Sequence, residues 1–248
     1  MINAMIFDLD GTLVQTERLK ALSYARALLE LCSDNVTEAQ VIEAFRDVVG
    51  LSRRQVAARL LAKFSAEGAA KQHAAEFGVH TPWQAFIQIR LRYYESMVAD
   101  PQVLRDNQWP HNMALLESAR RADCKVGLAT MSHCQQVQHV LKALELTDSF
   151  DFIATRDDVE QGKPDPEIYL LTAQGVGVPA SQCLVIEDSP TGVQAALNAG
   201  MWCIAVATPF TRKKLYESNL LDQGWIVDDP KQLPTVLEKM LAERLAER

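Results

Sequence analysis

Two aspartates near the start of the chain have the residue type and spacing for metal binding or for nucleophilic and proton-transfer chemistry. Asp8 and Asp10 stand two residues apart, directly after the apolar run 4–7 and directly before Gly11. Residues two apart in an extended strand share a face, and a following glycine can let the backbone turn so that both carboxylates reach one site. An Asp-Gly pair after a strand is also a common turn, so this pair alone leaves both interpretations open.

Other polar side chains stand in the same relation to later apolar runs. They are Thr130 after residues 125–129, Lys163 in a proline-flanked loop after 152–154, and Glu187 with Asp188 after 183–186. Ligands of open α/β sheets bind at the carboxyl ends of the strands, so we expect these side chains to converge on one crevice. Each could instead cap a helix or lie in an exposed loop, but such roles do not require a common place at successive strand ends.

Such a crevice would gather four carboxylates, one hydroxyl and one ammonium group. That crowding is unfavourable unless a cation lies among the acids, and oxygen ligands with open water positions suit Mg²⁺. Mg²⁺ and Lys163 together could hold a phosphate dianion and neutralise the charge that develops during its transfer. One carboxylate could attack phosphorus while the other moves a proton.

The elements that must position these residues are short apolar strands that alternate with amphipathic helices. We expect strands at residues 4–7, 125–129, 152–154, 183–186, 203–206 and 225–227. Strand alternating with helix predicts an α/β fold with a Rossmann-like, doubly wound parallel sheet whose two faces are both covered.

Two helices of this pattern carry end signals. For the helix expected at 133–146, Ser132 and Gln135 form a potential capping box. For the helix after residue 188, Ser189 can cap, Pro190 suits the first turn, and Gly200 suits a left-handed stop.

Residues 16–100 show helical periodicity almost throughout and contain no good strand. We therefore expect an inserted all-helical domain at 16–100, and an α/β core built from residues 1–15 and 101–248.

Composition narrows the class of protein. The chain has 248 residues, of which 48% are hydrophobic and 23% charged, as in ordinary globular proteins. A net charge of −7 disfavours a nucleic-acid partner, and no apolar run approaches the ~18 residues that a membrane span needs. Five widely spaced cysteines, an odd number, suggest free thiols in a reducing cytoplasm. We expect a cytoplasmic protein, with a monomer as the default.

Four motifs, taken in order, resemble those of the haloacid dehalogenase-like hydrolase superfamily. They are Asp-Leu-Asp-Gly-Thr at 8–12, Val-Gly-Leu-Ala-Thr at 126–130, Gly-Lys-Pro-Asp-Pro at 162–166, and Val-Ile-Glu-Asp-Ser at 185–189 followed by Gly192. The chain is most similar to the branch that holds β-phosphoglucomutase and phosphoglycolate phosphatase. The resemblance covers nearly the whole chain when residues 16–100 are counted as the family's cap domain.

The resemblance implies catalytic roles. Asp8 would be the nucleophile that becomes an aspartyl-phosphate, and Asp10 the general acid for the leaving alcohol and then the base for water. Thr130, Lys163 and the amide of Met131 would hold the transferring phosphoryl group. A carboxylate at position 10 also argues against the dehalogenase and phosphonatase branches, which lack it.

The same resemblance implies a magnesium site. Mg²⁺ would be bound by Asp8, Asp188 and the backbone carbonyl of Asp10, with Glu187 acting directly or through water. Gln15 departs from the family pattern because many relatives carry an acidic residue there.

The cap should supply the residues that choose the substrate. The segment 50–53 resembles a family loop whose arginine, here Arg53, grips a distal phosphate, and Arg90 falls near a lysine used in the same way. Lys20 stands where β-phosphoglucomutase has a histidine, and Met131 replaces a small polar residue. Arg53, Arg90 and Lys20 could form a cationic lid over a second anionic group of the substrate.

We therefore expect a Mg²⁺-dependent phosphatase of a small phosphorylated metabolite. One alternative is a phosphosugar mutase that uses the same aspartyl-phosphate, which Lys20 and Gln15 make less favourable. A more distant alternative is a non-enzymatic phospho-receiver or binding module. A receiver would be about half this length and would carry its acceptor aspartate on a middle strand rather than on the first.

Overall fold

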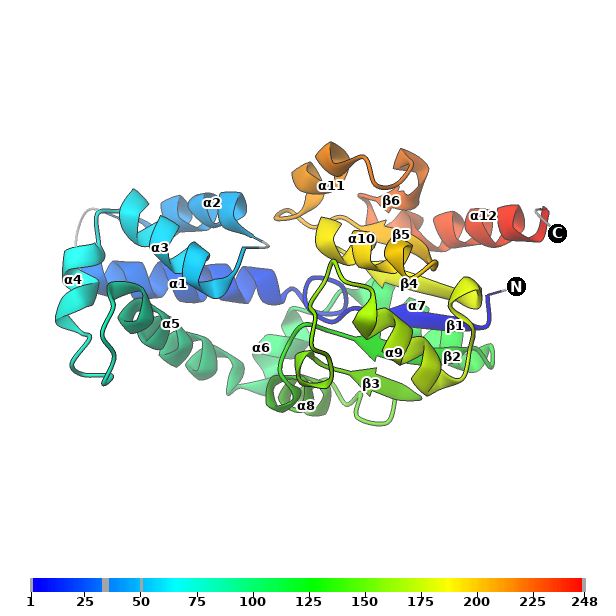
Figure 1. The fold of residues 1–248 in the computed structure, drawn as a ribbon, viewed down its shortest axis with the longest axis horizontal. Helices are drawn as coiled ribbons and strands as arrows, with labels where there is room; N and C mark the ends of the chain where they lie inside the picture. The colour runs from blue at the N-terminus through cyan, green and yellow to red at the C-terminus, as the bar shows by residue number, and fades with distance from the viewer. Residues whose placement is uncertain (1, 33–35, 50, 247–248) are drawn as a thin grey trace. The chain divides into compact units, whose positions relative to one another are not determined.

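The computed structural model describes residues 2–32, 36–49 and 51–246. These fall into two compact units (Figure 1). The core unit is formed by Met1–Gln15 and Leu104–Arg248, and the helical unit by Thr16–Val103.

The core unit is built on a six-stranded sheet in which every neighbouring pair is parallel. The strands are β1 (Ala4–Phe7), β2 (Lys125–Ala129), β3 (Phe152–Ala154), β4 (Cys183–Glu187), β5 (Trp202–Val206) and β6 (Ile226–Val227). Their order across the sheet is β3-β2-β1-β4-β5-β6, so β1 lies between β2 and β4 near the centre. The predicted α/β class with a doubly wound parallel sheet is confirmed.

The predicted strand limits hold to within one residue. The first three strands begin and end where the sequence pattern placed them, while β4 runs on to Glu187 and β5 begins at Trp202. The sixth strand is one residue shorter than expected because Trp225 belongs to a 3-10 turn, in which its amide donates to the carbonyl of Asp222 at 2.9 Å.

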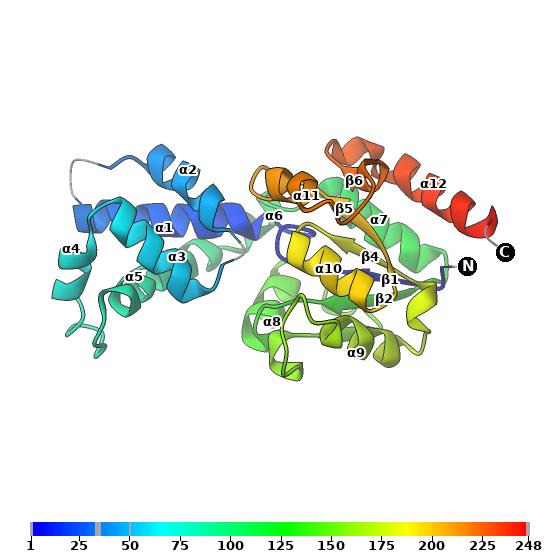
Figure 2. The ribbon, with the colours of Figure 1, turned by 45° about the horizontal axis from the view of Figure 1, so that its top comes forward.

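Helices cover both faces of this sheet. The helices of the core unit are α7 (Pro110–Arg121), α8 (Cys134–Ala143), α9 (Glu167–Val176), α10 (Pro190–Asn198), α11 (Arg212–Ser218) and α12 (Leu233–Ala246). Helices α9 and α10 lie on one face, and α7 and α12 on the other (Figures 1 and 2). The central strand β1 is buried along its whole length, which is why its residues are all apolar.

The predicted end signals of α10 are confirmed. The Ser189 hydroxyl accepts a hydrogen bond from the Gly192 amide at 3.1 Å, Pro190 occupies the first turn, and Gly200 follows the helix with a φ of +72°. This left-handed conformation is one that glycine adopts without a steric penalty.

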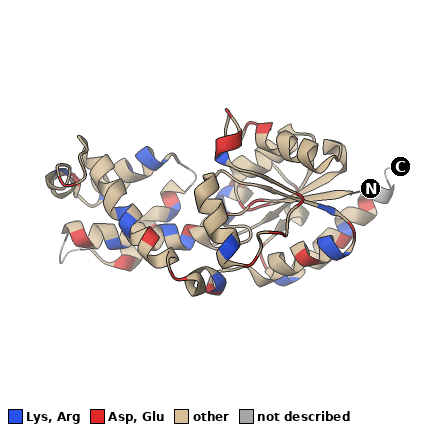
Figure 3. Cartoon of the chain, turned by 90° about the horizontal axis from the view of Figure 1, so that it is seen from below, with Lys and Arg blue, Asp and Glu red and all other residues tan. Residues whose placement is uncertain are grey.

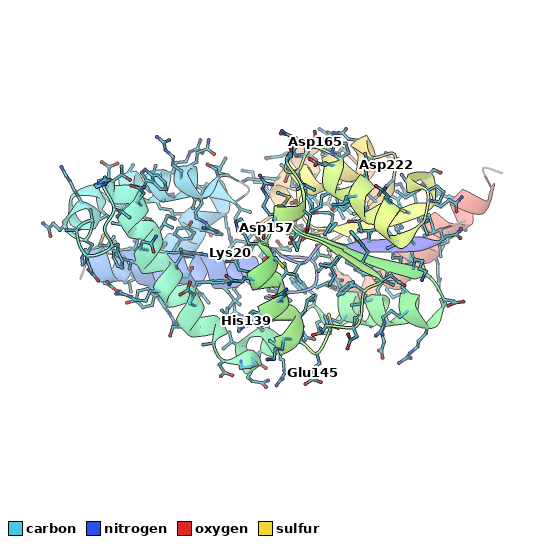
Figure 4. The ribbon with its side chains drawn as sticks, turned by 60° about the horizontal axis from the view of Figure 1, so that its bottom comes forward. Lys20, His139, Glu145, Asp157, Asp165 and Asp222 are labelled. Carbon is cyan, nitrogen blue, oxygen red and sulfur yellow. The ribbon has the colours of Figure 1, made fainter. Side chains whose placement is uncertain are left out.

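The predicted capping box of α8 is wrong. The helix begins at Cys134, and the carboxylate of Asp157 accepts the Cys134 amide at 2.7 Å (Figure 4). A charged carboxylate is a stronger acceptor than a serine hydroxyl. Ser132 is thereby left to donate its hydroxyl to Asp10, and Gln135 is exposed.

The helical unit contains α1 (Thr16–Cys32), α2 (Glu38–Val48), α3 (Arg53–Lys63), α4 (Glu67–Gln72), α5 (Pro82–Val98) and the start of α6 (Pro101–Asp106). Its described residues include no strand, as the sequence predicts. Capping boxes at Thr37, Ser52 and Thr81 begin three of these helices. Tyr24 packs at its centre, with its ring centroid 5.5 Å from that of Phe45 and 5.6 Å from that of Phe86.

Acidic and basic residues are interspersed along the helices of both units (Figure 3). Within the described ranges, no helix has both the length and the apolar character needed to cross a lipid bilayer. All five cysteines are free thiols.

Candidate active site

The loop that follows β1 brings three of the predicted acidic residues close together. Asp8 is buried, and its amide donates to the carbonyl of Ile186 on the neighbouring strand at 3.0 Å. Gly11 has a φ of +88°, and a Cβ added there would lie 2.2 Å from Asp188 Oδ2. Glycine is therefore required for the turn and for the space that the Asp188 carboxylate occupies beside Asp10 and Gly11.

Lys163 joins the ends of three strands. Its side chain is 5% exposed, and its ammonium group has three hydrogen-bond acceptors. They are Asp8 Oδ1 at 2.8 Å, Glu187 Oε1 at 2.7 Å and the carbonyl oxygen of Ala129 at 3.1 Å. Each N–H of the ammonium can thus find an acceptor, and the proline-flanked loop directs this lysine inward.

Glu187 is the most heavily bonded acid of the site. Its Oε1 accepts from Lys163 and from the hydroxyl of Tyr169 at 3.1 Å. Its Oε2 accepts from the amides of Asp188 and Ser189, both at 2.8 Å, and from the Ser189 hydroxyl at 3.0 Å. A carboxylate with five protein donors and 1% exposure is better placed to hold its neighbours than to bind a metal ion directly.

The loop after β2 brings a hydroxyl to Asp10. Ser132 donates to Asp10 Oδ2, and its own amide donates to Thr130 Oγ1 at 3.1 Å. The carbonyl of Ser132 accepts the amide of Arg156 at 3.1 Å, which fixes the loop from the other side. Thr130 is fully buried. The side chain of Met131 lies against Gly162, in the loop that carries Lys163. A Cβ added at Gly162 would be 2.8 Å from the terminal carbon of Met131.

The structure therefore gathers Asp8, Asp10, Thr130, Met131, Lys163, Glu187 and Asp188 at the carboxyl ends of β1, β2 and β4 or in the loop after β3. Sequence reasoning missed two further residues at this place. One is Ser132, for which the sequence pattern predicts only a helix cap. Tyr169 falls on the buried face of α9, and a buried tyrosine on such a face signals a polar partner for its hydroxyl.

Burial dominates the electrostatics of the site. It raises the pKa of Asp8 well above its usual value, the charges of Glu187 and Asp10 raise it further, and Lys163 lowers it. Burial alone would lower the pKa of Lys163, but Asp8 and Glu187 outweigh it and raise that pKa instead. Burial, with the charges of Glu187 and Asp8, also raises the pKa of Tyr169, so its hydroxyl stays protonated and donates. The acids Asp8, Asp10, Glu187 and Asp188 outnumber the ammonium group of Lys163, so an added cation would be stabilised at this site.

The donor set fits a hard divalent cation. No group of three or more His, Cys, Asp or Glu side chains within the described ranges is arranged to hold a metal by itself. The carboxylate of Asp188 lies against the backbone turn at Gly11, which directly follows Asp10, and Asp8 follows β1 beside the end of β4. Two carboxylates and a carbonyl, with the other positions open to water or phosphate oxygen, are the ligands that Mg²⁺ takes in enzymes.

Three of the four predicted substrate-binding residues, Lys20, Arg53 and Arg90, lie in the helical unit, whereas Met131 lies in the core unit. Burial raises the pKa of the Tyr24 hydroxyl, while the charges of Arg90, Arg53 and Lys20 each lower it. The guanidinium of Arg90 is buried between two rings, 5.1 Å from the centroid of Tyr24 and 4.7 Å from that of Tyr94. The charges of Arg53, Arg90 and Lys20 thus all act on Tyr24, and we call these three cations the Tyr24 cluster. The Lys20 ammonium also pairs with Glu17 Oε1 at 3.4 Å.

The remaining predictions for this region concern the segment 50–53 and Gln15. Gly50 lies outside the described residues, whereas Ser52 caps α3 and leaves Arg53 exposed at its first position. The amide of Gln15 donates to the carbonyl of Asn107 at 2.7 Å, which ties the two segments of the core unit together next to the helical insert.

Comparisons with known proteins identify a family and several relatives that are similar to this chain. A family model described as haloacid dehalogenase-like hydrolase matches residues 2–200. A phosphorylated carbohydrates phosphatase from Thermotoga maritima is 28% identical over 81% of this chain and 82% of its own length. A phosphoglycolate phosphatase from Pseudomonas savastanoi is 28% identical over 92% of this chain and 77% of its own. The crystal structure of β-phosphoglucomutase from Clostridium difficile, at 24% identity, covers all of both chains with a TM-score of 0.69 and shows the same fold.

The space around Glu187 can be tested by adding one methyl group. A Cβ at Gly192 would lie 1.7 Å from Glu187 Oε1, and five donors hold that carboxylate in place. We expect Gly192→Ala to lower the free energy of unfolding by roughly 2–4 kcal/mol in urea titrations.

Gly68→Ala in α4 is the matched control, because a Cβ there meets nothing within 4 Å. It should leave stability unchanged or raise it by up to ~1 kcal/mol. A Gly192→Ala protein as stable as the wild type would show that Glu187 can move without cost.

Proposed function

The chain belongs to the haloacid dehalogenase-like hydrolase family, and on that premise we propose that it is a Mg²⁺-dependent phosphatase of small phosphorylated metabolites. The observation that carries the proposal is the buried hydrogen bond from Lys163 to Asp8, at 2.8 Å. Asp8 lies in the loop after β1, which also holds Asp10. A carboxylate nucleophile, a cation for the phosphoryl group and a second carboxylate for the proton are then present within one site. The phosphatases among its relatives support the same reaction class.

In the proposed reaction, Asp8 attacks phosphorus and the bond from phosphorus to the leaving oxygen breaks. Asp10 gives the leaving alcohol its proton. The product on the enzyme is an aspartyl-phosphate on Asp8. Asp10, now a carboxylate, takes a proton from water, which attacks phosphorus and releases inorganic phosphate. The two half-reactions restore both aspartates to their starting states.

The other residues of the site would orient the phosphoryl group. Lys163 lies within hydrogen-bond distance of Asp8, so its charge would be next to a phosphoryl group carried there. Thr130 and the Met131 amide follow the end of β2 on the same side. Ser132 holds the carboxylate of Asp10 from within the core unit, which supports a proton-transfer role for Asp10.

We propose Asp8, Asp188 and the carbonyl of Asp10 as the magnesium ligands. A divalent cation there would offset the excess of carboxylates and stabilise negative charge on phosphate. Glu187 would act by holding Lys163 rather than as a direct ligand, since protein donors take both of its oxygens.

We further propose that the helical unit acts as the cap domain and that the Tyr24 cluster binds a second anionic group of the substrate. The charges of all three cations act on Tyr24, and the Arg90 guanidinium lies 5.1 and 4.7 Å from the ring centroids of Tyr24 and Tyr94, so the cluster would supply positive charge for such an anion. The match to a hydrolase family over residues 2–200 disfavours the receiver alternative.

The nucleophile is tested by replacing one oxygen with nitrogen. We expect Asp8→Asn to reduce hydrolysis of p-nitrophenyl phosphate by about a thousandfold or more, since the amide cannot attack phosphorus. A chelator should abolish wild-type turnover, and added Mg²⁺ should restore it.

Asp222→Asn, at an exposed carboxylate of the core unit, is the matched control and should turn over like the wild type (Figure 4). Metal-independent turnover, or full activity of Asp8→Asn, would contradict the proposed mechanism.

The acceptor of the phosphoryl group separates phosphatase from mutase. Offered β-glucose 1-phosphate with a trace of the bisphosphate, the enzyme should release inorganic phosphate if it accepts this sugar, because Asp10 would activate water. Glucose 6-phosphate formed without inorganic phosphate, followed by ³¹P NMR, would instead establish the mutase.

The Tyr24 cluster is tested by pairs of substrates that carry one or two anionic groups. We expect Arg53→Ala to raise KM about tenfold for the doubly anionic substrates and to leave KM for the others unchanged. Arg59→Ala, an exposed arginine on the same helix, is the control. An Arg53→Ala enzyme with an unchanged KM for both substrate classes would reduce Arg53 to a surface residue.

A further inference from the structure

Tyr169 is a fully buried tyrosine whose hydroxyl lies among the charged groups of the site. It is in the first turn of α9, on the face that also carries Ile168 and Thr172. Its hydroxyl donates to Glu187 Oε1 at 3.1 Å, and Lys163 Nζ lies 4.7 Å from its ring centroid. Phenylalanine would fill the same volume, so the hydroxyl adds a polar contact that packing alone does not need.

Two donors share a single oxygen of Glu187. Lys163 and Tyr169 both donate to Oε1, at 2.7 and 3.1 Å, while Oε2 is taken by donors from residues 188 and 189. If Lys163 turned away, Oε1 would keep one hydrogen bond as long as Tyr169 is present. Without the Tyr169 hydroxyl, this buried oxygen would lose its last donor, which is costly in a low-dielectric interior.

Lys163 has no N–H to spare for a phosphoryl oxygen in the arrangement observed. Its acceptors are Asp8, Glu187 and the Ala129 carbonyl, which match the three hydrogens of an ammonium group. To bind phosphate it must give up or share one of these bonds. The Lys163 ammonium also lies over the Tyr169 ring, 4.7 Å from its centroid, where a cation–π contact favours its charge.

We propose that Tyr169 is a positioning residue for phosphate binding, which acts through Lys163 and Glu187. The Tyr169 hydroxyl remains a donor to Glu187 Oε1 when the Lys163 ammonium donates one of its hydrogen bonds to the phosphoryl group instead. The Tyr169 ring keeps the ammonium in place. This role rests on the proposed function, because it assigns phosphate as the ligand that Lys163 takes up.

The test compares two tyrosine–carboxylate pairs of the core unit. Tyr169→Phe removes only the hydroxyl that donates to Glu187. Tyr216→Phe is the matched control, because the Tyr216 hydroxyl donates to Asp228 Oδ2 at 2.9 Å in an exposed pair. Each full-length protein is measured in Mg²⁺ for orthophosphate affinity by calorimetry, for kcat and KM with p-nitrophenyl phosphate, and for Tm.

We expect Tyr169→Phe to weaken orthophosphate binding and to lower kcat/KM, each by about tenfold, in a protein that stays folded. Tyr169→Leu should weaken orthophosphate binding further, because it also removes the ring. Tyr216→Phe should match the wild type in both affinity and kinetics.

A Tyr169→Phe protein with wild-type phosphate affinity and kcat/KM overturns the proposal, whatever its Tm, because the tyrosine would then serve packing alone. A Tyr169→Leu protein that binds phosphate as well as Tyr169→Phe overturns the role of the ring. If the wild type binds orthophosphate but hydrolyses no ester, the proposed function fails, and the calorimetric comparison still decides the role of Tyr169. A wild type that does not bind orthophosphate contradicts both.

Discussion

The site depends on one buried ammonium group that holds carboxylates from different strands together. Lys163 reaches Asp8 at the end of β1 and Glu187 at the end of β4, at 2.8 and 2.7 Å. Removing these charges from water is costly, and their attraction offsets that cost only when hydrogen bonds satisfy the remaining oxygens. The five donors to Glu187 meet this requirement, whereas the remaining acids still exceed the available positive charge. The excess of carboxylates therefore leaves the site prepared for a cation.

Close backbone approach makes this packing possible. At Gly11 the chain turns with a positive φ and passes so near Asp188 that no side chain would fit. At Gly192 the first turn of α10 lies directly against the carboxylate of Glu187. Both glycines belong to motifs that also carry the acids, so the residues that do chemistry and those that make room for them are adjacent in sequence. A strand order that sets β1 between β2 and β4 then completes the site.

The two units divide the work that we propose. The core unit holds the groups for phosphoryl transfer, all within reach of the ends of its central strands, and its Ser132 donates a hydrogen bond to Asp10. In the helical unit the charges of Arg53, Arg90 and Lys20 act on Tyr24, and the Arg90 guanidinium lies close to the rings of Tyr24 and Tyr94. Chemistry on rigid strand ends and recognition on a separate helical insert let substrate choice change without disturbing the reacting groups.

The sequence by itself determined the class of sheet, all six strands to within a single residue, the caps of α10, and the group of acids with Lys163. Local patterns sufficed because apolar runs, turn glycines and cap residues act over a few positions. Only the tertiary structure decided which oxygen meets which donor. The sequence pattern predicts Ser132 as the helix cap, but Asp157 caps the helix instead. Asp157 accepts the Cys134 amide although it lies 23 residues further along the chain. Five protein donors meet the oxygens of Glu187, and one of them, the Tyr169 hydroxyl, comes to the site from α9. These outcomes depend on competition among groups far apart in the chain, and no local pattern records that competition.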